Sequence, residues 1–352
     1  MSKRRTFLKS ASALGATFML PKIGTGNENR PTTATPTRIK PKKLRKGDTI
    51  GLVAPGYAIK PDVLQKALET LHKMGFKTFH TNRIIGNHGY FSNTDVERVK
   101  DLHEMFANPE IDAILCARGG YGCTRILTHL DYDIIRNNPK ALIGFSDITA
   151  LIQGIYKETG LICFHGPVGS TIGDAYSQKY FKKVLMKGKD SQIIENVKLK
   201  DLELLNHSEY EQYTITSGNC KGELVGGSLT LVNALVGTPH EIDFTDKLVF
   251  LEDVEEAPYR MDRMLTQLIE GSTFSKAKGI VFGVCKGCDR EKKPDNFTLK
   301  EVIMDRIAPL GLPSAYGMSF GHVPNNFTVP VGIHAAFDAD DMTLELLEAA
   351  VI

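Results

Sequence analysis

The chain has 352 residues, which is enough for a large core and two domains. Its formal net charge is only +2, and its hydrophobic and charged fractions of 42% and 24% are ordinary for a globular protein. No basic stripe indicates binding to nucleic acid. No apolar stretch is long enough to predict a membrane-spanning helix.

The first 25 residues have the pattern of an export signal. The pair Arg4 and Arg5 stands before the sequence FLK and a short, mildly apolar segment, as in twin-arginine signals. This predicts a protein of the periplasm or cell envelope; if the segment is only a basic tail, the protein stays in the cytoplasm. Residues 26–45 are rich in Pro, Thr, Asn and Lys, a composition that predicts a disordered linker.

Strand-like and helix-like segments alternate in the first half of the chain. Apolar runs with glycine or proline near their ends predict strands, and amphipathic periods between them predict helices. This alternation is typical of a parallel sheet covered by helices in an α/β domain, which we place at residues 46–190. In chain order the strands are expected within 48–56, 77–82, 111–122, 141–147 and 161–167, and the helices within 61–76, 92–110 and 148–160.

The regular alternation of predicted strands and helices weakens in the second half of the chain. Residues 191–215 are polar and are predicted to cross to a second domain at residues 216–352. In this domain a Gly-Gly turn at 226–227 opens a helix, and the chain closes with paired strands within 329–347. Further strands are expected within 247–253, 278–285 and 313–322, and helices within 259–271 and 298–311.

Reactive side chains follow four of the predicted strands. In open α/β sheets the carboxyl ends of the strands carry the ligand site. These ends hold a serine, an acid and a histidine in the chain order Ser, Glu, His. The residues are Gly119 and Gly120, Ser146 and Asp147, Glu252 and Asp253, and His322.

These residue types suit nucleophilic catalysis. A serine hydroxyl needs a base to take its proton, the base needs an acid to orient it, and the developing oxyanion needs hydrogen-bond donors. Ser146 is the candidate nucleophile, His322 the base and Glu252 the acid. The backbone N–H groups of Asp147, Gly119 and Gly120 are the candidate oxyanion donors.

Each assignment has a structural alternative. Ser146 and Asp147 also suit the N-terminal cap of the following helix. Glu252 stands in an acidic cluster that is typical of a solvated turn, with Asp253 and Glu255 as the next candidate acids.

Metal chemistry has little support in the sequence. The six cysteines are scattered, and Cys285 and Cys288 form a lone C-x-x-C pair without the further ligands of a zinc site. We expect structural thiols with at most one disulfide. The sequence ARGGYG lacks the lysine of a phosphate-binding P-loop and the G-x-G-x-x-G spacing of a dinucleotide site, and no H-E-x-x-H or similar spacing indicates a metal site. We therefore predict no metal and no cofactor.

Six motifs taken together are more specific than any one of them. In this order VAPG, ARGGYG, GFSD, GGSLTLVNALVGTP, FLEDVEEAPYRMDRML and FGH resemble the LD-carboxypeptidase family of serine peptidases, which includes microcin-immunity-type enzymes. The resemblance implies an N-terminal nucleotide-binding-like α/β domain and a C-terminal β-rich α/β domain with the site at their interface. It also implies that Ser146 is the nucleophile, Glu252 the triad acid and His322 the base, without a metal. Oxyanion donation would fall to the backbone of Asp147 and of Gly119 or Gly120.

The resemblance further implies the reaction. Family members cleave the bond between an L-centre and a terminal D-amino acid, typically releasing D-alanine from a muramyl tetrapeptide in peptidoglycan turnover or recycling. By its position, Arg118 is a candidate for binding the terminal carboxylate, and a structural ion pair is its alternative role. The competing functions are a microcin-immunity-type hydrolase of acyl-adenylates and a non-catalytic muropeptide-binding protein. A homodimer is common in the family.

Overall fold

The computed structural model describes residues 36–197, 207–289 and 295–352. The predicted export signal at 1–25 and the first ten residues of the predicted linker lie outside these ranges. Within them, no helix is long and apolar enough to cross a membrane.

A mixed sheet of six strands is built mainly from the first half of the chain. Its strand order is β12-β5-β4-β3-β1-β2. All neighbouring pairs are parallel except β5 and β12. The strands are β1 (Thr49–Val53), β2 (Lys77–Phe79), β3 (Ala113–Cys116), β4 (Ala141–Gly144), β5 (Phe164–His165) and β12 (Val329–Pro330).

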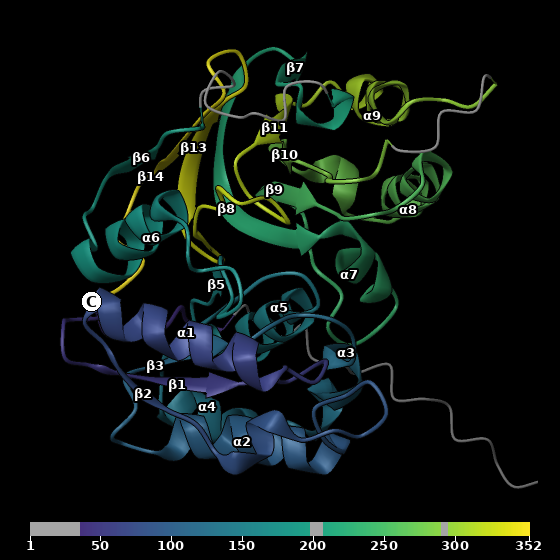
Figure 1. Cartoon of the computed structure of the whole chain (residues 1–352). Helices are drawn as coiled ribbons and strands as arrows, with labels where there is room; N and C mark the ends of the chain where they lie inside the picture. The colour runs from purple at the N-terminus through teal and green to yellow at the C-terminus, as the bar shows by residue number, and fades with distance from the viewer. Residues whose placement is uncertain (1–35, 198–206, 290–294) are drawn as a thin grey trace, which may run out of the picture. The chain divides into compact units, whose positions relative to one another are not determined.

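Helices cover both faces of this sheet, as the alternating pattern predicted. α1 (Pro61–Met74) and α2 (Asp95–Ala107) lie on opposite faces (Figure 1). α1 begins at a proline and ends at Gly75 in the left-handed conformation, whereas Thr94 and Glu97 form a capping box at the start of α2. The other helices are α3 (Cys123–Ile126), α4 (Tyr132–Asn137), α5 (Ile148–Thr159) and α6 (Ala175–Lys182), with one π-helical turn at Lys183–Lys187.

A second sheet has eight strands in the order β6-β14-β13-β8-β9-β10-β11-β7. Its centre, β8 to β11, is parallel, and antiparallel strands flank it on both sides. The strands are β6 (Gln192–Ile194), β7 (Tyr213–Thr216), β8 (Asn219–Ser228), β9 (Lys247–Glu252), β10 (Gly279–Gly283), β11 (Ser314–Met318), β13 (His334–Asp338) and β14 (Thr343–Leu346).

Three helices accompany the second sheet: α7 (Leu229–Ala234), α8 (Pro258–Glu270) and α9 (Leu299–Ile307). Buried side chains of α8 and α9, such as Leu265 and Ile303, pack with Val249 and Ile280 of the sheet in one apolar cluster. The expected pair of α/β domains, the second richer in strands, is thus confirmed.

Parts of the predicted organisation differ from the structure. Residues 36–45 are not a disordered linker, because Ile39 forms backbone hydrogen bonds with Gly160 and Ile162 and Lys40 pairs with Glu348 at 2.7 Å. The crossing segment contributes β6 and most of β7 to the two edges of the second sheet. The late strand β12 returns to the first sheet, so residues after 216 complete both sheets. The six cysteines do not differ from the expectation of structural thiols, because all of them are free thiols in the structure.

Candidate active site

Ser146 occupies a tight turn between β4 and α5. β4 ends at Gly144, α5 begins at Ile148, and Ser146 has a positive φ of 66°. The backbone N–H of Thr149 donates to the Ser146 carbonyl at 2.9 Å, so the helix starts directly from this strained residue. Asp147, the N-cap residue, makes no side-chain cap. A left-handed serine between a buried strand and a helix is the geometry of a nucleophile elbow.

The glycine turn after β3 approaches Ser146 closely. A Cβ on Gly119 would lie 2.8 Å from Ser146 Cβ and 3.0 Å from its Oγ. Gly120 has a φ of +118°, and a Cβ there would collide with Tyr57 at 2.4 Å. Glycine is therefore required at both positions, and backbone of this turn lies beside the serine hydroxyl.

Asp147 anchors the glycine turn. Its buried Oδ2 accepts a hydrogen bond from the backbone N–H of Cys123 at 2.8 Å. Burial raises the pKa of Asp147, and hydrogen bonds from Cys123 oppose this rise. The side chain that suggested a helix cap from the sequence thus connects the Ser146 turn to the segment that contains Gly119 and Gly120.

Glu252 and His322 form a directed pair. Nδ1 of His322 lies 2.7 Å from Glu252 Oε2, and because a carboxylate only accepts, the imidazole N–H is the donor. Gly321 makes this approach possible, since a Cβ there would lie 2.6 Å from Glu252 Oε2. Glu252 ends β9 and is fully buried, which excludes the alternative that it belongs to a solvated acidic turn.

Glu252 and His322 each shift the pKa of the other. Burial lowers the pKa of His322, but the Glu252 carboxylate more than offsets burial, so this pKa lies above its ordinary value of 6.5. Burial alone would raise the pKa of Glu252, and the charge of His322 holds it below its ordinary value instead. The pair is therefore set to stabilise an imidazolium at His322.

Contacts between the sheets bring the Ser146 turn and the Glu252–His322 pair together. Ser228 at the end of β8 is in register with Glu252 of β9, and its backbone N–H donates to Thr149 Oγ1 of α5 at 3.1 Å. Phe145, the residue before Ser146, packs against the His322 ring with centroids 4.8 Å apart. The Ser146 turn follows a strand of the first sheet and the Glu252–His322 pair follows strands of the second, and the contact of Phe145 with His322 places the turn near the pair.

The neighbouring acid has a different partner. Asp253 Oδ2 accepts from the backbone N–H and the hydroxyl of Thr230, at 2.8 and 2.9 Å, in the first turn of α7. Burial and the charge of Glu252 raise the pKa of Asp253 to about 7. Asp253 therefore positions α7, whereas Glu252 is the acid that contacts the histidine.

Arg118 stands beside Gly119 and does not form the ion pair that was its alternative role. Its Nη1 donates to the Ala58 carbonyl at 3.0 Å, and its guanidinium lies over the Tyr57 ring at 5.5 Å. Within the described ranges no carboxylate pairs with it. The guanidinium therefore keeps donors for another acceptor next to the glycine turn.

His165 is a site neighbour that sequence reasoning missed. It ends β5, next to β4, and its fully buried ring packs against Phe145, Phe250 and Phe320. Burial lowers its pKa to about 4, while the charge of Glu252 acts to raise it. The signal was present, because His165 directly follows an apolar run in the same way as the other site residues.

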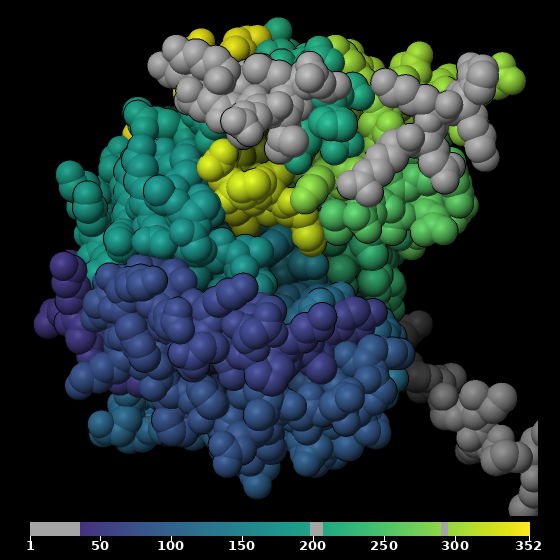
Figure 2. Space-filling view, viewed as in Figure 1, coloured from purple at the N-terminus to yellow at the C-terminus, as the bar shows by residue number. Residues whose placement is uncertain are grey.

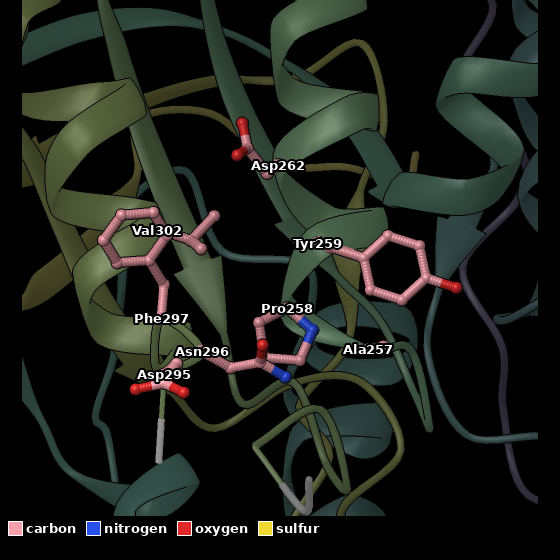
Figure 3. A pocket seen from close by; sticks show the side chains of 8 residues that line it. All are labelled: Ala257, Pro258, Tyr259, Asp262, Asp295, Asn296, Phe297 and Val302. Atoms are coloured by element: carbon pink, nitrogen blue, oxygen red, sulfur yellow. The ribbon is translucent and has the colours of Figure 1, made fainter. Parts of the chain in front are cut away.

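A separate pocket of about 350 Å³ lies near the starts of α8 and α9 (Figure 3). Tyr259 at the start of α8 and Phe297 just before α9 line it, and Asp262 and Asp295 add two carboxylates. None of the residues predicted for catalysis lines it. In the part of the chain that the structure describes, no group of three or more His, Cys, Asp or Glu side chains is arranged to hold a metal ion.

Comparison with known proteins gives the family. The sequence model of the LD-carboxypeptidase N-terminal domain matches residues 50–166, and that of the C-terminal domain matches residues 221–337. A probable murein peptide carboxypeptidase of Bacillus subtilis is 38% identical over 315 residues, which cover 89% of this chain and 95% of the relative.

Two further proteins are similar over most of their length. The murein tetrapeptide carboxypeptidase of Pseudomonas aeruginosa is 28% identical over 296 residues, covering 83% of this chain and 93% of the relative. The crystal structure of an MccF-like protein from Bacillus anthracis superposes with a TM-score of 0.78 at 30% identity, covering 88% of this chain and 99% of the other. The chain therefore belongs to the LD-carboxypeptidase family and is a serine carboxypeptidase, a hydrolase.

Proposed function

We propose that the protein releases the terminal D-alanine from muramyl tetrapeptides by a Ser146–His322–Glu252 triad. The observation that carries the proposal is the 2.7 Å contact of a fully buried carboxylate with His322, next to a serine at φ 66°. The relatives named as murein peptide and murein tetrapeptide carboxypeptidases support the choice of substrate.

The proposed reaction has two steps. Ser146 Oγ attacks the carbonyl carbon before D-alanine while Nε2 of His322 takes the hydroxyl proton, and Glu252 stabilises the imidazolium. Backbone N–H groups of Asp147 and of Gly119 or Gly120 hold the oxyanion. His322 then protonates the leaving amine. In the second step water attacks the acyl-serine while His322 takes the proton of the water, and His322 then returns this proton to Ser146 Oγ.

In this proposal Arg118 restricts cleavage to the last residue of the substrate by binding its terminal carboxylate. Its guanidinium takes the terminal carboxylate in two parallel hydrogen bonds. Support comes from its position next to Gly119 and from the lack of a carboxylate partner among the described residues.

One further substrate class has structural support. Tyr121 directly follows the glycine turn, and its exposed ring lies near the exposed ring of Tyr90. The two ring centroids are 5.9 Å apart. Such rings offer a stacking platform for a nucleobase, and the similarity to an MccF-like protein favours testing an acyl-adenylate.

The deciding experiment measures D-alanine release from a muramyl tetrapeptide by the purified protein and by Ser146→Ala. Release by the parent alone supports both the reaction and the nucleophile. If neither protein releases D-alanine, hydrolysis of an aminoacyl-adenylate is measured next, and activity there would replace the peptide substrate in the proposal.

We also propose export through the Arg4–Arg5 segment, supported by the sequence pattern alone. Replacing both arginines with lysine is expected to leave the protein in the cytoplasm. Cell fractionation of both forms tests this, and an unchanged distribution would count against a twin-arginine signal.

A further inference from the structure

The turn that follows β1 lies against the glycine turn of the proposed site, in the part of the chain that forms the purple to blue surface in the lower half of Figure 2. A Cβ on Gly56 would lie 3.3 Å from the Gly119 carbonyl oxygen. The Tyr57 ring packs on Gly120, since a Cβ there would lie 2.4 Å from Cγ of Tyr57. On the other glycine, Gly119, a Cβ would lie 3.0 Å from Ser146 Oγ. Two adjacent glycines thus connect the Tyr57 ring to the proposed nucleophile.

Backbone contacts and a second ring fix the position of Tyr57. Tyr57 forms an antiparallel bridge with Phe91, and the backbone N–H of Ala58 donates to the Tyr90 carbonyl at 3.1 Å. The centroids of the Tyr57 and Tyr90 rings are 5.5 Å apart. Tyr57 is half-buried, whereas Tyr90 is 55% exposed. The Tyr57 ring is therefore supported by both Gly120 and Tyr90.

A buried arginine ties the two turns together. Nη1 of Arg98 donates to the carbonyl of Pro55, which precedes the Gly56–Tyr57 pair, and to the carbonyl of Gly122 at 3.1 Å. Its guanidinium also lies over the Phe91 ring, 4.5 Å from the centroid. Because Arg98 is buried, a movement of one turn away from the other would break hydrogen bonds of a buried charge, which is costly.

The guanidinium of Arg118 lies over the same tyrosine ring. It is 5.5 Å from the Tyr57 centroid, and its Nη1 donates to the Ala58 carbonyl at 3.0 Å. A carboxylate that binds to Arg118 therefore lies beside Tyr57. In the proposed reaction this group is the terminal carboxylate of the leaving residue.

The leaving residue has little room to avoid Tyr57. One residue spans only roughly 3.6 Å along an extended chain. The leaving residue connects the scissile bond at Ser146 to the carboxylate at Arg118, so it passes along the glycine turn on which the Tyr57 ring packs. Its side chain then has this ring as a neighbour.

We propose that Tyr57 bounds the subsite of the leaving residue and restricts it to small side chains, such as the methyl group of D-alanine. A branched side chain would overlap a ring that Gly120 and Tyr90 hold in place. Tyr57 is thus a specificity-determining residue. This inference rests on the proposed peptidase function and adds a selection by size to the carboxylate contact at Arg118.

The test compares two muramyl tetrapeptides that end in D-alanine or in D-leucine, by the ratio of their kcat/KM values. The parent is expected to prefer D-alanine, and Tyr57→Ala should reduce this preference roughly tenfold or more, because it opens space for the larger side chain. Tyr57→Phe keeps the ring and should keep the preference. Tyr259→Ala is the matched control, since this exposed tyrosine also lies under a guanidinium, that of Arg263 at 5.4 Å.

A general loss of structure would lower both kcat/KM values together and leave their ratio unchanged. An unchanged ratio in Tyr57→Ala would therefore overturn the inference, and so would the same loss of preference in Tyr57→Phe. If the parent releases neither amino acid, the proposed function has failed, and calorimetry on Ser146→Ala then tests the subsite alone. Tighter binding of the D-alanine peptide that disappears when Tyr57→Ala is added supports the subsite. Equal binding of both peptides, or a preference that persists, refutes it.

Discussion

The backbone N–H of Ser228 donates to Thr149 Oγ1 at 3.1 Å, and this bond joins the helix that starts after Ser146 to the strand in register with Glu252. Gln153, one turn further along the helix, donates to the Gly226 carbonyl at 2.6 Å. A Cβ on Gly227 would lie 2.5 Å from Thr149. The distance between the nucleophile and the acid–base pair therefore depends on this helix–strand contact.

Thr149→Val tests that dependence. The variant keeps the shape of the side chain but leaves the buried Ser228 N–H without its acceptor, so the free energy of unfolding should fall by about 1–3 kcal/mol. We expect kcat to fall at least tenfold as well, because a small shift misaligns the reacting groups. Thr159→Val is the control, since Thr159 Oγ1 accepts from the Leu161 N–H at the other end of the same helix. Equal kcat values for both variants would contradict the argument.

Ser146→Gly and Ser146→Ala separate backbone strain from chemistry. Both variants remove the nucleophile, and turnover should fall on the order of 10⁶-fold. Because φ is 66° at this position, the free energy of unfolding should be about 1 kcal/mol higher for Ser146→Gly than for Ser146→Ala. Urea denaturation of the two inactive proteins measures the difference. Equal stability would mean that the turn stores no strain.

Glu252→Gln tests the acid. A neutral amide cannot stabilise the imidazolium, and kcat should fall on the order of 10⁴-fold. In the parent, Glu252 raises the pKa of His322, so the acidic limb of kcat/KM should have its midpoint above pH 6.5. Removing the carboxylate charge lowers this pKa, and the limb should move to lower pH. If the midpoint of the acidic limb stays at the same pH in Glu252→Gln, the limb reports the titration of a group other than His322.

Gly119→Ala tests the glycine turn. The new methyl group would lie 2.8 Å from Ser146 Cβ, so the turn or the serine has to shift. We expect activity to fall roughly 10²–10³-fold, as for loss of one oxyanion donor. Gly173→Ala is the control, because a Cβ there has no neighbour within 4 Å. Full activity of Gly119→Ala would exclude this turn from the reaction.

The candidate residues could be named from the sequence because their signals are local. Ser146, Glu252 and His322 each follow an apolar run, and the carboxyl ends of such strands are where ligand sites form in α/β sheets. That the first of these strands lies in one sheet and the other two in a second sheet is not a local property. The pairing of Glu252 rather than Asp253 with His322 is not local, since it depends on which carboxylate faces the histidine across β10. Sequence position alone could not decide between these neighbours.

The errors concern partners that are distant in the chain. Arg38 and Lys40 looked like linker residues, but both bind Glu348 near the other end of the sequence. β12 pairs with Phe164 and His165 of β5, although more than half of the second domain lies between the two strands in the sequence. Helix α6 has a local signal, because the Asp174 side chain accepts from the Ser177 N–H, but its polar sequence hid the helical period.

His165→Phe tests whether the buried histidine behind the site makes the fold acid-sensitive. Its pKa is about 4 in the folded chain and near 6.5 when exposed, so between these values the unfolded chain binds a proton that the folded chain does not. Stability contributed by the neutral ring is therefore present above pH 6.5 and is lost as the pH falls to 4, by at most about 3 kcal/mol. Phenylalanine suits the surrounding rings of Phe145, Phe250 and Phe320 and cannot bind the proton, so urea unfolding of this variant should depend less steeply on pH in that window. Replacing the exposed His129 with glutamine is the control. If the parent and His165→Phe lose stability equally between pH 6.5 and 4, the acid sensitivity lies elsewhere.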